Sequence, residues 1–249
     1  MQKQIKMSVR LIKRANSIMR VLTGCEVHKV DTTVERRTKW LKSLGIKTIF
    51  DIGANRGQFA MEAFQIYGNI KIVSFEPLQD CYAELLKIKS TYPSLTPYPF
   101  ALGDTSEDSF IYRSSYAPSS SMLEMDDRHK ALFPFSADLT KERIRIRRLD
   151  EVASEIDVEP ALLIKLDVQG FEDRVIMGGR KTFARAKMII TEVNFERLYK
   201  GQADFNKVHS LLHDLGFRFR GFLHETHNKT TGCLDFADAY FLSDITIYE

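Results

Sequence analysis

The sequence has little cysteine, and its cysteines are not arranged in pairs. The 249 residues include three cysteines, an odd number, and none of them belongs to a Cys-x-x-Cys motif. A disulfide framework needs paired cysteines and a structural zinc site needs closely spaced ligands, so the sequence argues against both. Unpaired cysteines are typical of a reducing compartment, and we therefore expect a cytoplasmic protein. The three are Cys25, Cys81 and Cys233.

Long apolar runs, glycine, proline and an excess of charge of one sign are also scarce. No apolar stretch reaches the roughly 20 residues that a membrane-spanning helix needs. Thirteen glycines and seven prolines among 249 residues exclude a collagen-like or low-complexity chain. The formal net charge is only +3. We expect no nucleic-acid partner, because such proteins concentrate basic residues on one face.

The first 22 residues depart from this even charge, because they contain six basic residues and no acidic one. Apolar residues recur there at helical spacing, which predicts a basic amphipathic helix. Lys13 and Arg14 interrupt the apolar run that a signal peptide would need. Such a helix could pack on its own domain or on a second subunit, or lie peripherally on an anionic membrane surface. We expect residues 1–35 to form an extension and residues 36–249 the main domain.

From about residue 36 onward, short apolar runs alternate with segments of helical periodicity. This alternation predicts β–α–β units and therefore an α/β fold with a parallel sheet. The last two strands, 217–223 and 238–242, are joined by a polar turn, which predicts an antiparallel hairpin. The other predicted strands are 48–52, 70–75, 97–102, 161–167 and 188–193, and the predicted helices are 58–67, 79–92, 171–178 and 204–215.

Residues 104–140 interrupt this alternation. The composition of residues 114–121 predicts a loop, and residues 143–148 alternate charged and apolar side chains, as a half-exposed or edge strand does. Loops over the carboxyl edge of a parallel sheet often carry binding residues. Segments 114–121 and 194–202 are therefore candidates for substrate binding, in which Tyr199 and Arg197 could stack on or hydrogen-bond a sugar. Solvated helix surface explains these residues equally well.

The first strand ends in the motif that carries most information about function. Asp51 closes the strand, and Gly53 and Gly57 bracket a turn into the next helix. Ligands of such sheets bind at the carboxyl ends of the strands, and glycines allow a tight turn and close backbone approach. A dinucleotide fingerprint needs Gly-x-Gly-x-x-Gly, whereas Asn55 stands here in place of the middle glycine. The spacing better fits a loop around an amino-acid-bearing nucleoside that has no phosphate.

Acidic residues also end the second and third predicted strands. Glu76, followed by Pro77, lies at the neighbouring strand tip, where a carboxylate can accept hydrogen bonds from both ribose hydroxyls. Ala101, Leu102 and Asp104 lie one strand further out, where an adenine ring would be flanked. Asp104 could reach the exocyclic amine of that ring. Together with the first strand, these tips predict a nucleoside site.

The fourth and fifth strand tips carry the candidate catalytic groups. Lys165 and Asp167 are two residues apart and therefore point to the same side of their strand. Two charges at the end of an apolar strand are costly unless they are paired or functional. Asp167 could orient an acceptor hydroxyl, take its proton or ligate a cation, and Glu192 could hold hydroxyls or join Asp167 around a metal. Two acids do not make a metal site, so no metal ligand is assigned.

Four motifs in order resemble the FkbM family of methyltransferases: residues 51–59 (DIGANRGQF), 75–77 (FEP), 101–104 (ALGD) and 164–172 (IKLDVQGFE). The resemblance covers roughly residues 35–243. It implies a class I methyltransferase fold, a Rossmann-like seven-stranded sheet of order 3-2-1-4-5-7-6 with the last strand antiparallel. It also implies S-adenosylmethionine as methyl donor and O-methylation of a sugar, glycolipid or polyketide-type hydroxyl. The sequence departs from the family at Gln169, where many members carry Glu.

The resemblance and the strand tips together assign residues to two groups. The candidate catalytic residues are Asp167, Lys165 and Glu192. His224 and His227, in the late polar turn, could also act as a base. The residues assigned to S-adenosylmethionine are Asp51, Gly53, Ala54, Asn55, Gly57, Gln58, Phe59, Glu76, Pro77, Ala101, Leu102 and Asp104.

Three other functions remain open at this point. The glycine spacing argues against a nicotinamide-dependent oxidoreductase. A nucleic-acid or other N-methyltransferase often carries an Asn/Asp-Pro-Pro-aromatic fourth motif, whereas residues 167–170 contain neither proline nor an aromatic side chain. A non-catalytic binding protein could keep the fold, although Asp51, Glu76 and Asp167 are all retained. The acceptor itself is not encoded in any motif.

Overall fold

The computed structural model describes residues 33–228, 230–244 and 246 of the chain. The predicted basic helix of residues 1–22 lies outside this range. The chain divides into two compact units, residues 1–44 and 45–249. Within the described part, the first unit contains helix α2 (Thr33–Ser43), and the predicted domain boundary after residue 35 stays a prediction.

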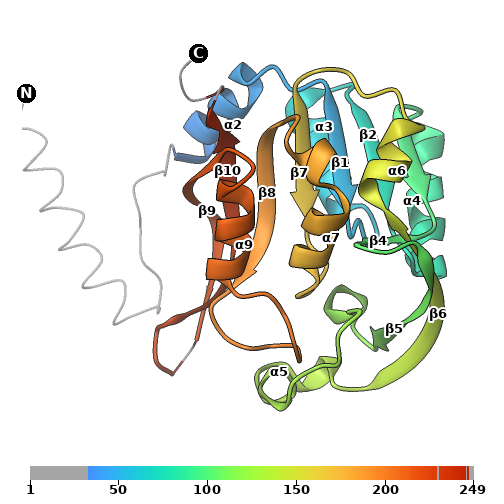
Figure 1. Ribbon diagram of the computed structural model, residues 1–249, viewed down its shortest axis with the longest axis vertical. Coiled ribbons are helices and arrows are strands. Elements are labelled where there is room, and N and C mark those ends of the chain that lie inside the picture. The colour runs from blue at the N-terminus through green and yellow to red at the C-terminus, as the bar shows by residue number, and fades with distance from the viewer. Residues whose placement is uncertain (1–32, 229, 245, 247–249) are drawn as a thin grey trace, which may run out of the picture. The chain divides into compact units, whose positions relative to one another are not determined.

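The second unit is built on a seven-stranded sheet of order β3-β2-β1-β7-β8-β10-β9 (Figure 1). Numbered by their order in the chain, these strands run 3-2-1-4-5-7-6, so the predicted class I methyltransferase topology is confirmed. The last strand, β10, runs antiparallel to both of its neighbours, also as predicted. The strands are β1 (Thr48–Ile52), β2 (Lys71–Phe75), β3 (Leu95–Tyr98), β7 (Leu162–Leu166), β8 (Ala186–Asn194), β9 (Phe217–His227) and β10 (Leu234–Ser243).

The central strands are buried on both faces, which explains their continuous apolar sequences. All five residues of β1 are buried. The main hydrophobic core lies on one face, where side chains of β1, β2, β7, β8 and β10 meet four helices. The helices on that face are α6 (Leu149–Ser154), α7 (Glu172–Gly178), α8 (Arg180–Phe183) and α9 (Phe205–His213). Figure 1 shows α3 (Gln58–Tyr67) and α4 (Gln79–Thr91) on the opposite face.

A second, three-stranded sheet corrects two predictions. Its order is β4-β6-β5, with β4 (Ala101–Gly103), β5 (Glu107–Ser114) and β6 (Leu139–Arg148). The strand predicted over 97–102 is wrong, because the main sheet keeps only its first part in β3 and β4 joins the second sheet. Pro99 has no backbone N–H and cannot extend the ladder of β3. Strand β5 was not predicted, since most of its residues are exposed or only half-buried.

The segment between β5 and β6 lies beyond the carboxyl ends of the main strands (Figure 1). It contains α5 (Asp127–Leu132) between two short 3₁₀ turns, Ala117–Ser119 and Pro134–Ser136. Met125 of this segment pairs with Tyr199, and both are buried in a small separate core. This contact joins two segments, 114–136 and 196–202, over the carboxyl edge of the sheet.

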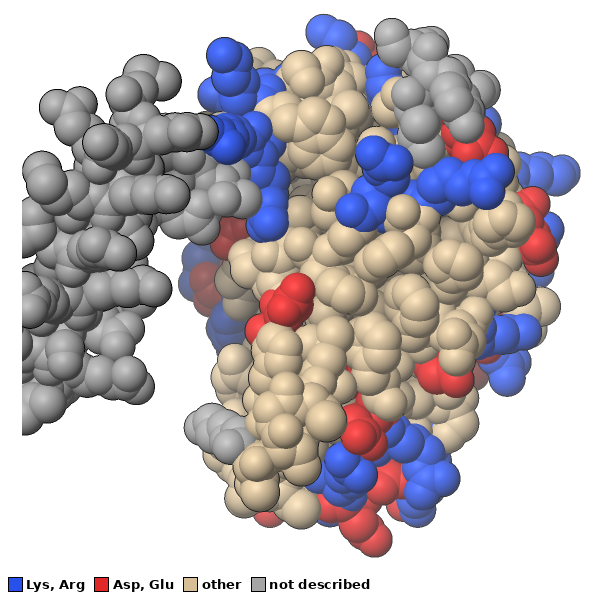
Figure 2. Space-filling view, turned by 90° about the vertical axis from the view of Figure 1, so that its left-hand side faces the viewer, with Lys and Arg blue, Asp and Glu red and all other residues tan. Residues whose placement is uncertain are grey.

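The β9–β10 hairpin forms the far edge of the sheet, as predicted. Figure 2 shows the side of the molecule that carries β9, and the middle of this face has few Lys, Arg, Asp or Glu side chains. Aromatic rings pack between α9 and the hairpin: the centroid of Phe205 lies 5.3, 5.6 and 6.5 Å from those of Phe195, Phe219 and Phe222. The cluster anchors α9 to the hairpin.

A glycine contact fixes α7 against β4. A Cβ atom on Gly178, at the end of α7, would lie 1.8 Å from the carbonyl oxygen of Gly103, far inside contact distance. Helix α7 and strand β4 must therefore separate if Gly178 gains a side chain. This contact matters for the site, because α7 follows directly on the β7 tip.

We expect Gly178→Ala to lower the free energy of unfolding by about 3 kcal/mol, because overpacking forces backbone shifts. Urea denaturation at neutral pH measures this. The control is Gly216→Ala, where φ is +85° but nothing lies within 4 Å of the added Cβ. That variant should lose only about 1 kcal/mol, the cost of a left-handed conformation. Equal losses in the two variants would contradict the contact.

Candidate functional site

The loop after β1 is shaped by contacts with the protein itself. Gly53 has φ +76°, and a Cβ there would lie 1.8 Å from the carbonyl oxygen of Asp167. Gly57 has φ +86°, and its Cβ would lie 2.4 Å from a methyl group of Ile88 on α4. Both glycines thus allow neighbouring elements to approach, beside any approach to a ligand. The first contact brings the β1 loop against the tip of β7.

Glu76, after β2, is buried and held in one orientation. Its two carboxylate oxygens accept hydrogen bonds from the backbone N–H groups of Asn55 and Leu78, each at 2.8 Å. Asn55 can donate this bond because it adopts a left-handed conformation with φ 47°. Burial raises the pKa of Glu76 to about 7, while the two hydrogen bonds act in the opposite direction. Each oxygen keeps a further lone pair for a ligand.

Lys165 of β7 places a positive charge between two carboxylates. Its ammonium nitrogen lies 3.4 Å from Asp167 Oδ2 and 3.6 Å from Asp51 Oδ1. It also donates a hydrogen bond of 3.1 Å to the carbonyl oxygen of Gly53. Burial alone would lower the pKa of Lys165, but Asp167 and Asp51 together raise it above its ordinary value. Lys165 therefore stays protonated and cannot serve as a base.

Asp51 is fully buried, and neither of its carboxylate oxygens has a hydrogen-bond partner. Burial raises its pKa, Lys165 lowers it, and the nearby charge of Asp167 raises it. A buried polar atom without a hydrogen bond is unusual in a native protein and indicates a ligand or water. Asp51 can therefore accept hydrogen bonds from a positively charged group of a ligand.

The tips of β7 and β8 carry a second pair of acids. Gln169 donates from its amide nitrogen to Asp167 Oδ1 at 2.8 Å and to Glu192 Oε2 at 3.2 Å. Glu192 is buried, whereas about a third of the Asp167 side chain is exposed. Burial raises the pKa of Glu192 well above its ordinary value, and the surrounding carboxylates, first Asp167, add to this shift. Both causes favour the protonated form of Glu192.

Two further acids, not assigned from the sequence, face this pair. Glu172, at the start of α7, is fully buried and accepts hydrogen bonds from the N–H groups of Val168 and Gly170. Asp238 of β10 lies opposite Glu192 in the ladder and contacts Nδ1 of His224 at 3.1 Å. Burial raises the pKa of Glu172 to about 7 and also raises that of Asp238. No local pattern marks Asp238 in the sequence, because its position depends on the pairing of distant strands.

The remaining assigned residues surround this centre unevenly. Phe59 lies with its ring centroid 6.0 Å from the ammonium of Lys165. Asp104 contacts Arg174 of α7 at 3.3 Å. The side chain of Leu102 packs into the main core and is not available to a ligand. Among the others, Ala54 is buried, Pro77 and Ala101 are half-buried, and Gln58 is exposed.

The candidate contact of Tyr199 with a substrate is wrong. Its side chain is fully buried, and its hydroxyl group contacts the side-chain oxygen of Gln169 at 2.8 Å and His129 Nε2 at 3.3 Å. Arg197 is largely exposed and pairs with Asp126. Tyr199 thus contacts the turn after β7 through the side chain of Gln169.

The site is strongly acidic as a whole. Six carboxyl groups lie around the strand tips, and Lys165 is the ammonium among them. Such a concentration of buried acids favours protonated carboxyl groups or a positively charged ligand. Among the described residues, no three His, Cys, Asp or Glu side chains are grouped to hold a metal ion. The six acids are Asp51, Glu76, Asp167, Glu172, Glu192 and Asp238.

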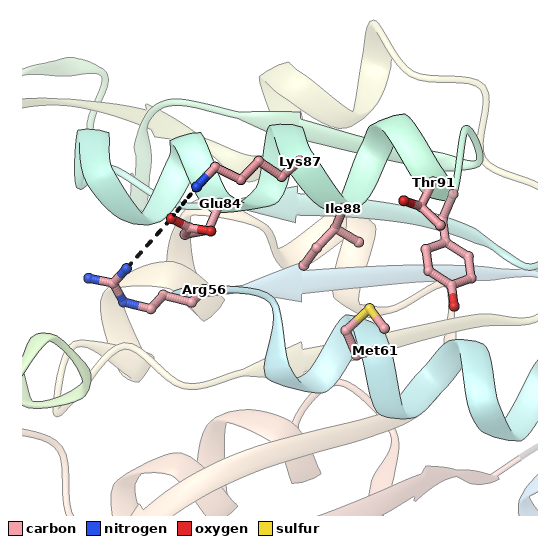
Figure 3. A pocket seen from close by; sticks show the side chains of 7 residues that line it. Arg56, Met61, Glu84, Lys87, Ile88 and Thr91 are labelled. Carbon is pink, nitrogen blue, oxygen red and sulfur yellow. Dashed lines mark hydrogen bonds and ion pairs between the residues drawn. The ribbon is translucent and has the colours of Figure 1, made fainter.

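A separate cavity of about 650 Å³ lies between α3 and α4 (Figure 3). Its charged rim is satisfied within the protein, because Glu84 lies 2.8 Å from Lys87 and 4.0 Å from Arg56. None of the residues that line this cavity is one of the six acids of the site. The lining residues are Arg56, Met61, Glu84, Lys87, Ile88, Thr91 and Tyr92.

In the part of the chain that the structure describes, no helix is long and apolar enough to span a membrane.

The raised pKa of Glu172 makes a prediction about stability. The folded protein keeps a proton on Glu172 up to about pH 7, whereas the unfolded chain loses it near pH 4.5. Stability from this group is therefore complete below pH 4.5 and is lost as the pH rises to 7. The Glu172→Gln variant would keep the two accepted hydrogen bonds without titrating. Between pH 4.5 and 8, wild type should lose about 3 kcal/mol more stability than Glu172→Gln.

Urea unfolding at several pH values measures this difference. Glu62→Gln, on the exposed face of α3, is the control and should follow wild type at every pH. Parallel stability curves for wild type and Glu172→Gln would show that Glu172 is ionised in the folded protein.

Comparison of the sequence with known proteins gives a family match. Residues 51–219, more than half of the chain, match the family described as "Methyltransferase FkbM domain". The 2-O-methyltransferase NoeI of Sinorhizobium fredii is 25% identical over 219 residues, which cover 84% of this chain and 85% of NoeI. The AMB antimetabolite synthetase AmbE of Pseudomonas aeruginosa is 26% identical over 178 residues, 60% of this chain and 8% of AmbE.

Solved structures with a similar fold also include methyltransferases. Magnesium protoporphyrin IX methyltransferase (ChlM) from Synechocystis PCC 6803, with bound SAM, aligns with 96% of this chain and 97% of its own. The identity is 12% and the TM-score is 0.46.

Proposed function

The chain belongs to the FkbM methyltransferase family, and we propose that it transfers the methyl group of S-adenosylmethionine to a hydroxyl oxygen of a sugar, glycolipid or polyketide-type acceptor. The observation that carries this proposal is the acidic carboxyl edge of the sheet. There Asp51 is buried without a hydrogen-bond partner, and Asp167 and Glu192 lie side by side at the next strand tips.

Two acids of this edge suit the donor. Bound S-adenosylmethionine supplies an electrophilic methyl group on a positively charged sulfur, beside an α-ammonium group. Asp51 would accept hydrogen bonds from the ammonium group, which its buried carboxylate lacks although Lys165 lies 3.6 Å away. Glu76, already oriented by two backbone N–H groups, would accept those of the ribose hydroxyls.

The role of the protein in methyl transfer is alignment and proton removal. Bound S-adenosylmethionine would give up its methyl group from sulfur to the acceptor oxygen, and the protein would hold that oxygen in line with the methyl group. Asp167, which is partly exposed, would orient the acceptor hydroxyl. Glu192 would take its proton, because a carboxylate with a raised pKa is a better match to general-base work near neutral pH. Lys165 would hold the Asp167 carboxylate in place through their ion pair.

The acceptor class rests on two supports. NoeI carries the name of a 2-O-methyltransferase, and its alignment spans most of both chains. The segments over the carboxyl edge also expose aromatic rings: Tyr116 is 49% and Phe135 62% exposed, and the two rings pack edge to face at 5.2 Å. Exposed aromatic rings are suited to the apolar face of a sugar ring or to a lipid-like chain.

Donor binding can be tested without knowing the acceptor. We expect Asp51→Asn and Glu76→Gln each to weaken S-adenosylmethionine binding at least tenfold, since each loses a charge-assisted hydrogen bond. Isothermal titration calorimetry measures both. Glu84→Gln, on the rim of the α3–α4 cavity, is the control and should bind like wild type. Unchanged affinity in Glu76→Gln would refute the assignment of the donor site.

Turnover tests the acids at the strand tips. With an acceptor that the protein methylates, Glu192→Gln should lower kcat about 10²- to 10⁴-fold, the range typical of a lost general base. Its affinity for S-adenosylmethionine should stay close to that of wild type. Mass spectrometry of the methylated acceptor provides the rate. Normal turnover in Glu192→Gln would remove its role as base, and normal turnover in Asp167→Asn would remove the orienting role.

A further inference from the structure

Gln169 lies at the turn between β7 and α7, in an unusual backbone conformation. Its φ is 54°, and Gly170 follows with φ 95°. Residues other than glycine rarely adopt such angles, and they persist where the surroundings hold them. The hydroxyl of Ser121 donates a hydrogen bond of 2.6 Å to the backbone carbonyl oxygen of Gln169. The turn is thus held by the segment over the carboxyl edge, and it directs the Gln169 amide toward the acids.

All polar atoms of the Gln169 side-chain amide are used. Its NH₂ group donates to Asp167 Oδ1 at 2.8 Å and to both oxygens of Glu192, at 3.2 and 3.3 Å. Its oxygen accepts a bond of 2.8 Å from the hydroxyl of Tyr199. The opposite amide orientation would place the oxygen against two carboxylates, so the neighbours fix the orientation.

Buried groups hold the amide from behind. The Tyr199 hydroxyl also lies 3.3 Å from Nε2 of His129, a residue of α5. Burial lowers the pKa of His129, so its ring is neutral and carries one N–H. With that N–H on Nε2, the ring donates to the Tyr199 oxygen. The single Tyr199 proton then has two acceptors, the side-chain oxygen of Gln169 at 2.8 Å and the carbonyl oxygen of Ser119 at 3.1 Å, and the contact with Gln169 is the shorter. With this proton on the Gln169 side, the hydrogen bonds run from His129 through Tyr199 and Gln169 to the carboxylates. In such a chain each hydrogen bond strengthens the next.

We propose that Gln169 is a positioning residue: its amide fixes the spacing of Asp167 and Glu192 and stabilises Glu192 as the carboxylate that accepts the acceptor's proton. This role rests on the proposed function. The amide is neutral, so it joins two acids without removing their charge. The Lys165 ammonium contacts Asp167, and the amide supplies hydrogen bonds to Glu192.

The negative charges around Glu192 and the hydrogen bond from Gln169 act on the pKa of Glu192 in opposite directions. Three acids face Glu192: Asp167 from β7, Glu172 from α7 and Asp238 from β10. All three raise its pKa, and the hydrogen bond from Gln169 lowers it. The basic groups nearby are already paired, Lys165 with Asp51 and Asp167, and His224 with Asp238; the buried Tyr199 hydroxyl completes the surroundings. Loss of the amide should therefore raise the pKa of Glu192.

The test follows the titration of Glu192 directly. Protein labelled with ¹³C at the glutamate carboxyl carbon is titrated by NMR, and the Glu192 signal is assigned by its loss in Glu192→Gln. In Gln169→Leu we expect the midpoint of Glu192 to rise by about one pH unit, the effect of one lost hydrogen bond to a charged group. Gln169→Glu keeps the shape but replaces the donor by another acid, so the midpoint should rise further.

Gln202 offers a matched control, because it is a glutamine of the neighbouring segment that contacts no carboxylate. Its oxygen accepts from the N–H groups of Leu198 and Tyr199, and its nitrogen donates to the carbonyl oxygen of Glu196. Gln202→Leu loosens this segment and should move the Glu192 midpoint much less than Gln169→Leu. An equal shift in the two variants, or a wild-type midpoint in Gln169→Leu, would overturn the proposal.

The experiment separates this proposal from the function it rests on. The NMR titration needs neither methyl donor nor acceptor, so it reports the Gln169 contact even if the protein methylates another group. With a methylated acceptor, the acid limb of the kcat/KM profile should shift upward in Gln169→Leu by the same amount as the NMR midpoint. An unshifted limb beside a shifted midpoint would show that Glu192 is not the base, and would overturn the positioning role.

Discussion

The ion pairs of Lys165 are the constraint on which the site depends. One ammonium group contacts the carboxylates of Asp51 and Asp167 and the carbonyl oxygen of Gly53, and so connects the tips of β1 and β7. Buried carboxylates at adjacent strand ends would otherwise repel one another or take up protons. Because Lys165 stays protonated, its charge offsets the repulsion between the carboxyl groups at this edge.

The acids at this edge differ in the charges and hydrogen-bond donors that surround them. Glu76 and Glu192 lie farther from a positive partner, and burial raises the pKa of both. Backbone N–H groups orient Glu76, whereas the Gln169 amide orients Glu192. In the proposed function, acids of the same type in different surroundings would serve the donor side and the acceptor side of the site. A cationic methyl donor fits such an edge better than an anionic dinucleotide does.

Much of this arrangement follows from local sequence patterns, and the rest depends on distant contacts. The strand at Thr48–Ile52 and the helix at Gln58–Tyr67 were predicted to the residue, because burial and periodicity are local properties. Asp51, Glu76, Asp167 and Glu192 were found because carboxyl ends of parallel strands share one edge. Asp238 and the Tyr199–Gln169 contact were not, since strand pairing and a hydrogen bond across 30 residues leave no local pattern. The sheet that β4 joins and the whole of β5 were not predicted, because both strands pair only with the distant β6.

The central claim is that this acidic edge receives a methyl donor and not a dinucleotide. Calorimetric titration of the wild-type protein with S-adenosylmethionine and, separately, with NADH tests it most directly, because both ligands carry adenosine but differ in charge. We predict saturable binding of one S-adenosylmethionine per chain and no heat of binding with NADH. Binding of NADH with no binding of S-adenosylmethionine would contradict the account.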